Sequence, residues 1–390
     1  MYKILKAGKL AGNIYEMVVE APRVAKHCLP GQFIIVKMDE VGERIPLTIC
    51  DYDREAGTVT IVFQPIGAST EKFTTLKAGD TFRDFVGPLG QPSDLCTEPL
   101  EEVKKKKILF VAGGVGTAPV YPQVKWLHEH GIDADVIVGA KTKDLVILEK
   151  ELSEVAGNLY VTTDDGSYGR KGLVTEGVEE VIKREKVNKC FAIGPAIMMK
   201  FVCLLTKKYE IPTDVSLNTI MVDGTGMCGA CRITIGGKTK FVCVDGPEFD
   251  GHQVDFDEML KRMGAFKSIE REEMHKLEED ESCKAVPEPT QEVDEKSRNA
   301  AWRLELRKAM KPKERTAIPR VEMNELDPEY RSHSRKEEVN QGLTEEQALT
   351  EAKRCLDCAN PGCMEGCPVG IDIPRFIKNI ERGEILEAAK

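Results

Sequence analysis

The stretch K-K-K-K-I-L-F-V-A-G-G-V-G-T-A-P at residues 104–119 decides the fold of the central part of this chain. Its apolar run predicts a buried strand, and its glycines predict a tight turn that leads into a helix. Further strand-like segments lie at 133–140, 159–166 and 189–195, and helical patterns near 119–130, 172–187 and 196–208 alternate with them. This alternation is typical of an α/β domain with a parallel sheet, which we expect over residues 104–215.

The glycine turn is a candidate dinucleotide site. Glycine lets the backbone approach a diphosphate closely, and the start of a helix attracts its charge. The candidate residues are those of the turn and of two later strand ends: Gly113, Gly114, Gly116, Thr117, Asp164, Asp165, Gly194 and Pro195. The turn is not a complete G-x-G-x-x-G, so a tight strand–helix connection without a ligand is the alternative.

The sequence leaves the choice of nucleotide open. Asp164 and Asp165 could accept hydrogen bonds from ribose hydroxyls, which favours NADH. Lys141 and Lys143 could instead hold the 2′-phosphate of NADPH.

Residues 1–100 have a different pattern, in which short alternating runs are separated by turn residues. The runs lie at 13–20, 31–38, 57–64 and 80–86. Short strands at this spacing predict a small antiparallel β-barrel.

A cysteine-rich stretch, D-G-T-G-M-C-G-A-C, occupies residues 223–231 and is followed by Cys243. As ligands it gives Asp223-x4-Cys228-x2-Cys231-x11-Cys243, the plant-type [2Fe–2S] spacing with a carboxylate in the first position. We expect a [2Fe–2S] segment over residues 216–262. A zinc knuckle and three buried thiols are the alternatives, but zinc usually takes a second C-x2-C or C/H pair.

Local structure favours the ligand interpretation. Residues 232–235 and 238–242 flank Gly236-Gly237, which predicts a hairpin that returns Cys243 to the side of Cys231. The glycines of the preceding loop would let backbone N–H groups point at the sulfurs. An aspartate beside glycine is also a common turn residue, so a purely structural role for Asp223 is the alternative.

The end of the chain carries a second cysteine cluster, Cys355-x2-Cys358-x4-Cys363-x3-Cys367-Pro. Apart from a longer middle gap it has the bacterial ferredoxin spacing, so residues 346–390 are expected to begin a helical [4Fe–4S] domain. A single four-cysteine zinc or iron–sulfur site is the alternative. Residues 263–345 are expected to form a charged helical linker.

Composition limits the class of protein. A length of 390 residues allows two or three domains. The formal charge of −10 argues against nucleic acid as a partner, and no apolar run is long enough to cross a membrane. Thirteen cysteines without a secretory signal indicate a reducing compartment, so we expect a cytoplasmic protein.

Two further motifs resemble the flavin site of the ferredoxin reductase superfamily: R-I-P-L-T at 44–48 and G-A-S-T at 67–70. The resemblance implies that Arg44 binds the FAD pyrophosphate, that Leu47 packs on the isoalloxazine and that Thr48 bonds near N5. It also adds Pro46, Gly67, Ser69 and Thr70 to the FAD-binding residues. Ile193 stands where the superfamily often has a cysteine near the nicotinamide, so no thiol role is expected there.

The first 265 residues resemble the electron-transfer subunit of class B dihydroorotate dehydrogenase. They resemble still more the alpha subunit of NADH-dependent reduced ferredoxin:NADP oxidoreductase, because that subunit has an aspartate at the position of Asp223. The tail resembles the N-terminal domain of the glutamate synthase small subunit. That resemblance assigns Cys355, Cys358 and Cys363 to one [4Fe–4S] cluster and Cys367 to another, which implies further ligands beyond Lys390 and hence the front part of a longer fusion.

The resemblance implies that NAD(P)H passes electrons through FAD and the [2Fe–2S] cluster to a partner flavoprotein of the beta type or to a ferredoxin. Hydride transfer to a flavin needs no acid, base or nucleophile of the protein, and we expect none. The alternatives are the electron-transfer subunit of a dihydroorotate dehydrogenase, the electron-input arm of a glutamate synthase, and a non-catalytic iron–sulfur docking subunit.

Overall fold

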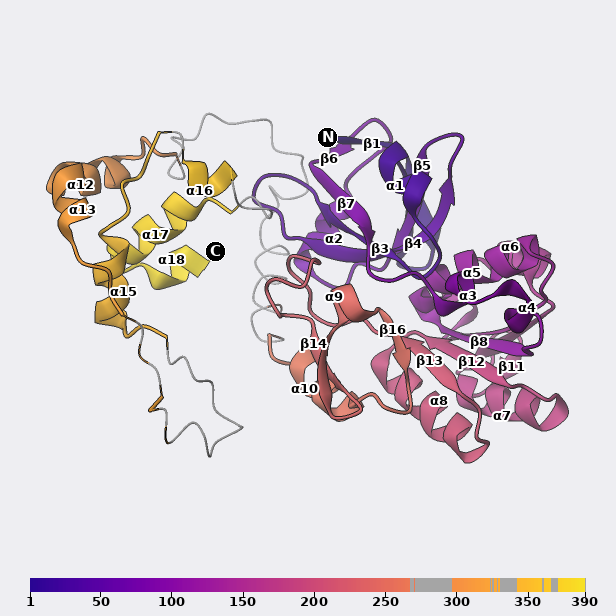
Figure 1. Cartoon of the computed structure of the whole chain (residues 1–390). Helices are drawn as coiled ribbons and strands as arrows, with labels where there is room; N and C mark the ends of the chain where they lie inside the picture. Colours follow the sequence, from indigo (N-terminus) through magenta and orange to yellow (C-terminus); the bar gives the residue numbers. More distant parts are fainter. Residues whose placement is uncertain are drawn as a thin grey trace. The chain divides into compact units, whose positions relative to one another are not determined.

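The computed structural model describes residues 1–266, 297–322, 342–359, 361–365 and 371–389, together with residues 270, 324, 326, 327 and 329. The chain divides into two compact units, Met1–Pro287 and Glu288–Lys390 (Figure 1). All strands of the described residues belong to the first unit, whereas the described part of the second is helical. Within the described residues no helix has both the length and the apolar character that a bilayer crossing requires.

The first unit begins with a seven-stranded antiparallel sheet in the order β6-β1-β2-β5-β4-β3-β7, so the predicted barrel is confirmed. Its strands are β1 (Tyr2–Ala11), β2 (Ile14–Glu20), β3 (Phe33–Lys37), β4 (Ile45–Asp53), β5 (Thr58–Phe63), β6 (Thr81–Phe82) and β7 (Asp84–Leu89), and its helices are α1 (Pro22–His27) and α2 (Ala68–Phe73). The alternating runs did not include β1 or β4. Lysines and Gly8 interrupt the apolar pattern of β1, and Pro46 stands near the start of β4, where a strand tolerates proline.

The predicted parallel α/β sheet is also confirmed, with the order β11-β10-β9-β8-β12-β13-β16 (Figure 1). Its strands are β8 (Ile108–Gly113), β9 (Asp135–Ala140), β10 (Asn158–Thr163), β11 (Arg170–Lys171), β12 (Lys189–Ile193), β13 (Thr213–Ser216) and the antiparallel edge strand β16 (Glu248–Asp250). Its longer helices are α5 (Thr117–Glu129), α6 (Glu149–Val155), α7 (Val174–Arg184) and α8 (Ala196–Lys208), preceded by the short α3 (Asp94–Thr97) and α4 (Leu100–Val103).

The order of the strands creates a switch point at the centre of this sheet. The chain adds β9 and β10 on one side of β8 and then returns to place β12 on the other side. Helices α5 and α6 pack in one hydrophobic cluster with Phe110, whereas α7 and α8 pack in another with Val111. In such sheets ligands bind beyond the carboxyl ends of the strands at the switch point, here at the ends of β8 and β12.

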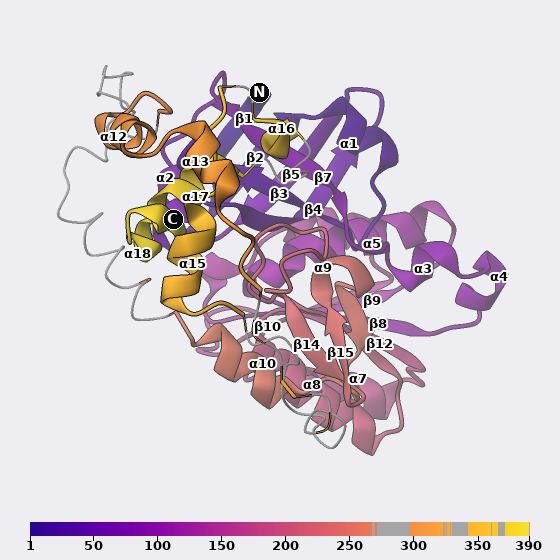
Figure 2. The ribbon, with the colours of Figure 1, turned by 60° about the vertical axis from the view of Figure 1, so that its left-hand side comes forward.

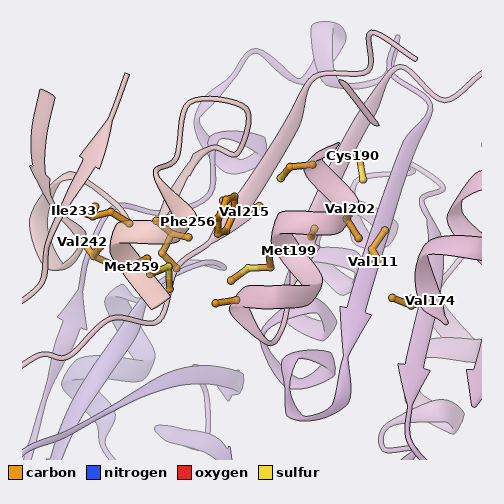
Figure 3. Close-up of a cluster of buried hydrophobic side chains, with 14 of the residues drawn as sticks. Val111, Val174, Cys190, Met199, Val202, Val215, Ile233, Val242, Phe256 and Met259 are labelled. Atoms are coloured by element: carbon orange, nitrogen blue, oxygen red, sulfur yellow. The ribbon is translucent and has the colours of Figure 1, made fainter. Parts of the chain in front are cut away.

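The cysteine-rich segment forms the predicted hairpin of β14 (Arg232–Ile235) and β15 (Lys238–Phe241), drawn in Figure 2, followed by α9 (Val242–Asp245) and α10 (Phe256–Met263). Gly236 and Gly237 both have positive φ, 57° and 76°, as a two-residue hairpin turn requires. Ile233 and Met259 of this segment share one hydrophobic cluster with Met199 of α8 (Figure 3), which fixes the segment on the α/β domain.

The described helices of the second unit are α12 (Ala301–Ala309), α13 (Pro312–Ala317), α15 (Glu345–Ala352), α16 (Gly362–Glu365), α17 (Ile373–Glu381) and α18 (Ile385–Ala389). Arg303 is 2% exposed and pairs with Asp357, which is 0% exposed. Arg315 pairs with Glu381 at 2.8 Å. Helices α12 and α13, which fall within the segment expected as a linker, are therefore joined by buried charges to the segments around the C-terminal cysteines.

Candidate cofactor sites

The turn after β8 lies at the switch point and packs directly against the turn after β12. A Cβ added to Gly116 would lie 2.4 Å from the carbonyl oxygen of Ile193, and one added to Gly194 would lie 3.0 Å from Cα of Gly113. Gly114 differs, because it has φ of +55° and its added Cβ would meet no atom within 4 Å. The sequence suggested one role for all these glycines, but the structure separates them: Gly113, Gly116 and Gly194 pack the turns together, whereas Gly114 borders open space.

Helix α5 begins directly after this turn. The Thr117 hydroxyl donates to the carbonyl oxygen of Gly114 at 2.8 Å, which ties the first helical residue to the glycine that borders open space. Pro195 precedes α8 on the neighbouring strand end. The predicted residues of the two turns therefore lie together at one edge of the sheet.

The acidic pair is placed at the end of β10, and both side chains are exposed. The Asp165 N–H donates to the Lys141 carbonyl at 3.3 Å, so the carboxylates and the candidate lysines share this part of the edge. Ser167 donates from its hydroxyl and its backbone to Asp165 Oδ1, at 2.7 and 2.9 Å, and these bonds lower the pKa of Asp165.

The second flavin-type motif of the barrel contacts the residue directly before the first. Pro46, Leu47 and Thr48 pair with β3. The Ser69 hydroxyl at the start of α2 donates to the Glu43 carboxylate, which precedes β4. The hydroxyl oxygen of Thr70 accepts the Gly67 N–H at 3.2 Å and fixes the turn before that helix.

Arg44 extends from the start of β4 to the cysteine-rich loop. Its Nε donates to the carbonyl oxygen of Val222 at 2.9 Å, and its Nη2 donates to that of Asp223 at 3.2 Å. Nη1 lies 4.0 Å from the Asp84 carboxylate. The predicted flavin motif and the predicted first cluster ligand, which the sequence alone did not connect, are therefore in direct contact.

Strand β4 also contacts the nucleotide-type domain. Lys125 of α5 forms an ion pair with Asp51 at 2.8 Å. Cys50 packs in one hydrophobic cluster with Ala118 at the start of α5. Strand β4 therefore lies between two other segments. Asp51 of the strand pairs with helix α5, and Arg44, directly before the strand, contacts the cysteine loop.

The hairpin brings the sulfurs of Cys231 and Cys243 close together, as predicted. The Sγ atoms of Cys231 and Cys243 lie 3.2 Å apart, and the Cys243 N–H points at Cys231 Sγ at 3.5 Å. The Ala230 N–H points at Cys228 Sγ at the same distance, and Cys228 is exposed. Burial, together with the hydrogen bond between the Cys243 thiol and Cys231, raises the pKa of Cys243 to about 12.

Asp223 is 5% exposed and organises this loop. Its Oδ1 accepts the Thr225 N–H at 2.5 Å, and its Oδ2 accepts the Cys228 N–H at 2.7 Å. Burial acts to raise the pKa of Asp223, but these bonds outweigh it and the pKa is lowered. The turn role is therefore present, and a carboxylate with about four lone-pair sites retains acceptor capacity for iron.

Among the described residues, no group of three or more His, Cys, Asp or Glu side chains is arranged to hold a metal ion. A [2Fe–2S] cluster instead distributes four ligands as two on each iron. In the second unit Cys358 and Cys363 are exposed and Cys355 is half-buried, while Cys367 lies outside the described residues. Lys378 donates to the carbonyl oxygen of Cys355 at 2.8 Å.

Glu248 of β16 is a further residue that sequence reasoning missed. Its Oε1 accepts from Gln123 of α5 at 2.7 Å, while its buried Oε2 has no hydrogen-bond partner. Burial raises the pKa of Glu248 to about 7. Residues distant in the sequence, among them Gln123 and Ser93, create this environment, so no local sequence signal identifies it.

Three family models match the chain. Residues 110–204 match the oxidoreductase NAD-binding domain, and residues 218–255 match the iron–sulfur cluster binding domain of dihydroorotate dehydrogenase B. Residues 331–390 match the domain described as dihydropyrimidine dehydrogenase domain II, 4Fe-4S cluster. These matches confirm a NAD-binding segment, an iron–sulfur segment and a [4Fe–4S] segment.

Relatives match about 70% of the chain over nearly their whole length. An uncharacterised protein of Clostridium beijerinckii is 59% identical and covers 72% of this chain and 95% of its own. The dihydroorotate dehydrogenase B (NAD(+)) electron transfer subunit homolog of Thermotoga maritima is 44% identical, with 69% and 93% covered. A solved structure of the NADH-dependent reduced ferredoxin-NADP oxidoreductase, described in connection with flavin-based electron bifurcation, is 41% identical, with 71% and 98% covered and a TM-score of 0.65. The chain therefore belongs to the family of the electron transfer subunits of dihydroorotate dehydrogenase B and their homologues.

Proposed function

We propose that this chain takes electrons from NAD(H), carries them through FAD and a [2Fe–2S] cluster, and passes them to a partner flavoprotein or a ferredoxin. The observation that carries the proposal is that the cysteine loop and helix α5 both contact the segment formed by the flavin-type motif of the barrel and strand β4. Arg44 contacts the cysteine loop, and Asp51 of β4 pairs with Lys125 of the helix behind the dinucleotide-type turn. The NAD-binding and iron–sulfur family matches, and the relatives named as electron transfer subunits, support it.

In this proposal the nucleotide diphosphate binds over Gly114 and the start of α5. That helix has 13 residues, so its first N–H groups and its dipole favour an anion there. Gly113 and Gly116 act indirectly, because they let the two turns pack closely. Gly194 and Pro195, which follow β12, form the other side of the same site. Thr117 holds the turn to the start of the helix.

FAD would be held by the two barrel motifs. Arg44 uses two of its five N–H donors on the cysteine loop, which leaves three for a pyrophosphate. The remaining FAD-binding residues of the proposal are Pro46, Leu47, Thr48, Gly67, Ser69 and Thr70. When bound, FAD supplies the exchange between the two-electron chemistry of the nicotinamide and the one-electron chemistry of the cluster.

The [2Fe–2S] cluster would be held by Asp223, Cys228, Cys231 and Cys243. The structure fits this donor set, because backbone N–H groups already point at two of the sulfurs and would stabilise thiolate charge. In the second unit the corresponding proposal is that Cys355, Cys358 and Cys363 bind one [4Fe–4S] cluster and that Cys367 binds another.

The nucleotide preference follows from the charges at the ends of β9 and β10. Asp164 and Asp165 would bond ribose hydroxyls of NADH and repel a 2′-phosphate, whereas Lys141 and Lys143 would attract one. The Ser167 hydroxyl holds the Asp165 carboxylate in place, which favours a ribose contact. The Lys143 ammonium instead lies 5.2 Å from the centre of the Tyr168 ring, so it is already engaged by an aromatic side chain. We therefore propose NADH as the preferred donor, with NADPH as the second candidate.

Anaerobic titration of the FAD- and iron-loaded full chain with NADH, and separately with NADPH, tests the proposal. We expect NADH to bleach the flavin absorbance at about one equivalent, and we expect Asp165→Asn to narrow the preference for NADH. Exposed Asp133→Asn serves as the matched control. If neither nucleotide reduces the flavin, the proposal is wrong and the non-catalytic docking alternative is favoured.

The partner that receives the electrons is a second question. The match to the iron–sulfur domain of dihydroorotate dehydrogenase B favours that enzyme, or a related flavoprotein, as the electron acceptor. The similarity to the solved NADH-dependent reduced ferredoxin-NADP oxidoreductase favours a partner within a bifurcating assembly. Mixing the reduced chain with each candidate acceptor and measuring the rate of reoxidation separates these candidates, with a glutamate synthase included as the third.

A further inference from the structure

Arg44 connects two sites that lie far apart in the sequence. Its guanidinium bonds the backbone carbonyls of Val222 and Asp223, which are 178 and 179 residues away. A guanidinium is a planar fork with five N–H donors, so an anion bound to its free donors restricts its orientation for the others.

The cysteine loop rests on the same barrel through a second contact. Gly224 has φ of +78°, and an added Cβ would lie 2.5 Å from Ile35 and 2.9 Å from Leu89, on strands β3 and β7. Because Gly224 has no side chain, the loop can approach the barrel closely at this point. Gly224 directly follows Asp223, whose carbonyl oxygen accepts a hydrogen bond from Arg44. Asp223 continues the chain of contacts by accepting the Cys228 N–H at 2.7 Å.

We propose that Arg44 is a positioning residue that couples the two cofactor sites, so that FAD binding and order in the [2Fe–2S] loop favour each other. This inference rests on the proposed function, since it takes Arg44 as a ligand of the FAD pyrophosphate. A pyrophosphate fixes the guanidinium, the fixed guanidinium holds the two carbonyls, and the held loop presents Asp223 and Cys228. Reciprocity follows from linkage: the cluster raises the affinity for FAD by the factor by which FAD raises that for the cluster.

The test is the FAD affinity of the full chain with and without its iron–sulfur clusters. FAD-free protein is prepared anaerobically in both forms, and FAD binding is followed by the quenching of flavin fluorescence. We expect cluster removal to weaken FAD binding about tenfold in the wild type, within the usual range of coupling between sites. In Arg44→Lys, which keeps the charge but loses the fork, we expect the two affinities to differ less than twofold.

Two variants make the result specific. Arg83→Lys changes another arginine of the barrel, paired with exposed Glu40, and we expect it to keep the wild-type ratio. Gly224→Ala displaces the loop without altering Arg44, so we expect it to reduce the ratio while the cluster-free protein binds FAD normally. This variant keeps the test valid if Arg44→Lys folds poorly.

The outcomes separate the inference from the proposed function. A protein that binds no FAD, or that forms no [2Fe–2S] cluster, contradicts the proposed function. A protein that binds both, but with the same FAD affinity in both forms or with the same ratio in wild type and Arg44→Lys, contradicts the coupling alone.

Discussion

The sulfur of Cys231 lies 3.2 Å from the sulfur of Cys243, although eleven residues separate them. The β14–β15 hairpin produces this proximity, because its two-glycine turn returns the chain to its starting point. Val242 also donates its N–H to the carbonyl oxygen of Cys231 at 3.2 Å, so the backbone closes the hairpin beside the sulfurs. The fold alone therefore brings together the two sulfur atoms that are proposed as cluster ligands.

Asp223→Cys tests the ligand role of the carboxylate. We expect the cluster to persist, because four thiolates are the common [2Fe–2S] set, with a changed EPR spectrum and a changed reduction potential. Asp223→Asn, which keeps only one of the two oxygen acceptors of the loop N–H groups, shows how much of any change comes from the turn role. A spectrum of Asp223→Cys identical to the wild type would mean that Asp223 is not a ligand.

Gly116→Ala tests the packing of the two turns. The added methyl group would lie 2.4 Å from the Ile193 carbonyl, so we expect a loss of about 1–3 kcal/mol in the free energy of unfolding and weaker NADH binding. Gly114→Ala meets no neighbour and should cost about 1 kcal/mol through its positive φ alone. Denaturant unfolding and NADH titration measure both quantities, and equal costs at the two positions would argue against the packing role.

Asp357→Asn tests the buried charges of the second unit. Arg303 and Arg307 both pair with this carboxylate, so neutralising it leaves buried guanidinium charge and should destabilise this unit by about 3 kcal/mol. Hydrogen exchange of the α12 amides in the full chain measures the change. Glu305→Gln, at an exposed position of the same helix, is the control, and unchanged exchange in Asp357→Asn would contradict the account.

Glu248→Gln tests the raised pKa of a buried carboxyl group. The folded-state pKa is about 7, against an ordinary value of 4.5, so the folded protein holds the proton more tightly. The stability that this group contributes is full below about pH 4.5 and is lost as the pH rises through 7. We expect the wild type to lose about 2–3 kcal/mol relative to Glu248→Gln between pH 5 and pH 8.

Urea unfolding at pH 5, 6, 7 and 8 measures this difference. Exposed Glu101→Gln is the control, for which we expect parallel curves. If the free energies of unfolding of the wild type and of Glu248→Gln also changed in parallel with pH, the carboxyl group of Glu248 would be ionised in the folded protein throughout this range.

Local patterns were sufficient to predict the fold where they were strong. The run that became β8, the turn at 113–116 and the hairpin at Gly236-Gly237 each depend on neighbouring residues, and each formed as predicted. Strands β1 and β4 were not predicted, because charged residues or proline interrupt their alternation while the neighbouring strands supply the burial.

The relationships between motifs could not be predicted in the same way. The contact of Arg44 with Asp223 and the burial of Glu248 against Gln123 join residues more than 100 positions apart. Tertiary packing determines such contacts, and no local pattern encodes them. The residue types at the candidate sites were therefore identifiable, whereas their contacts required the structure.

Low-temperature EPR of the iron- and FAD-loaded full chain after anaerobic addition of NADH tests the central claim most directly. We predict the spectrum of a reduced [2Fe–2S] cluster, close to one spin per chain, that is absent from Cys231→Ser and retained in Cys190→Ser, a buried cysteine outside both cysteine clusters. A chain that binds iron and flavin but gives no [2Fe–2S] signal after NADH addition would contradict the account, as would a signal that persists unchanged in Cys231→Ser.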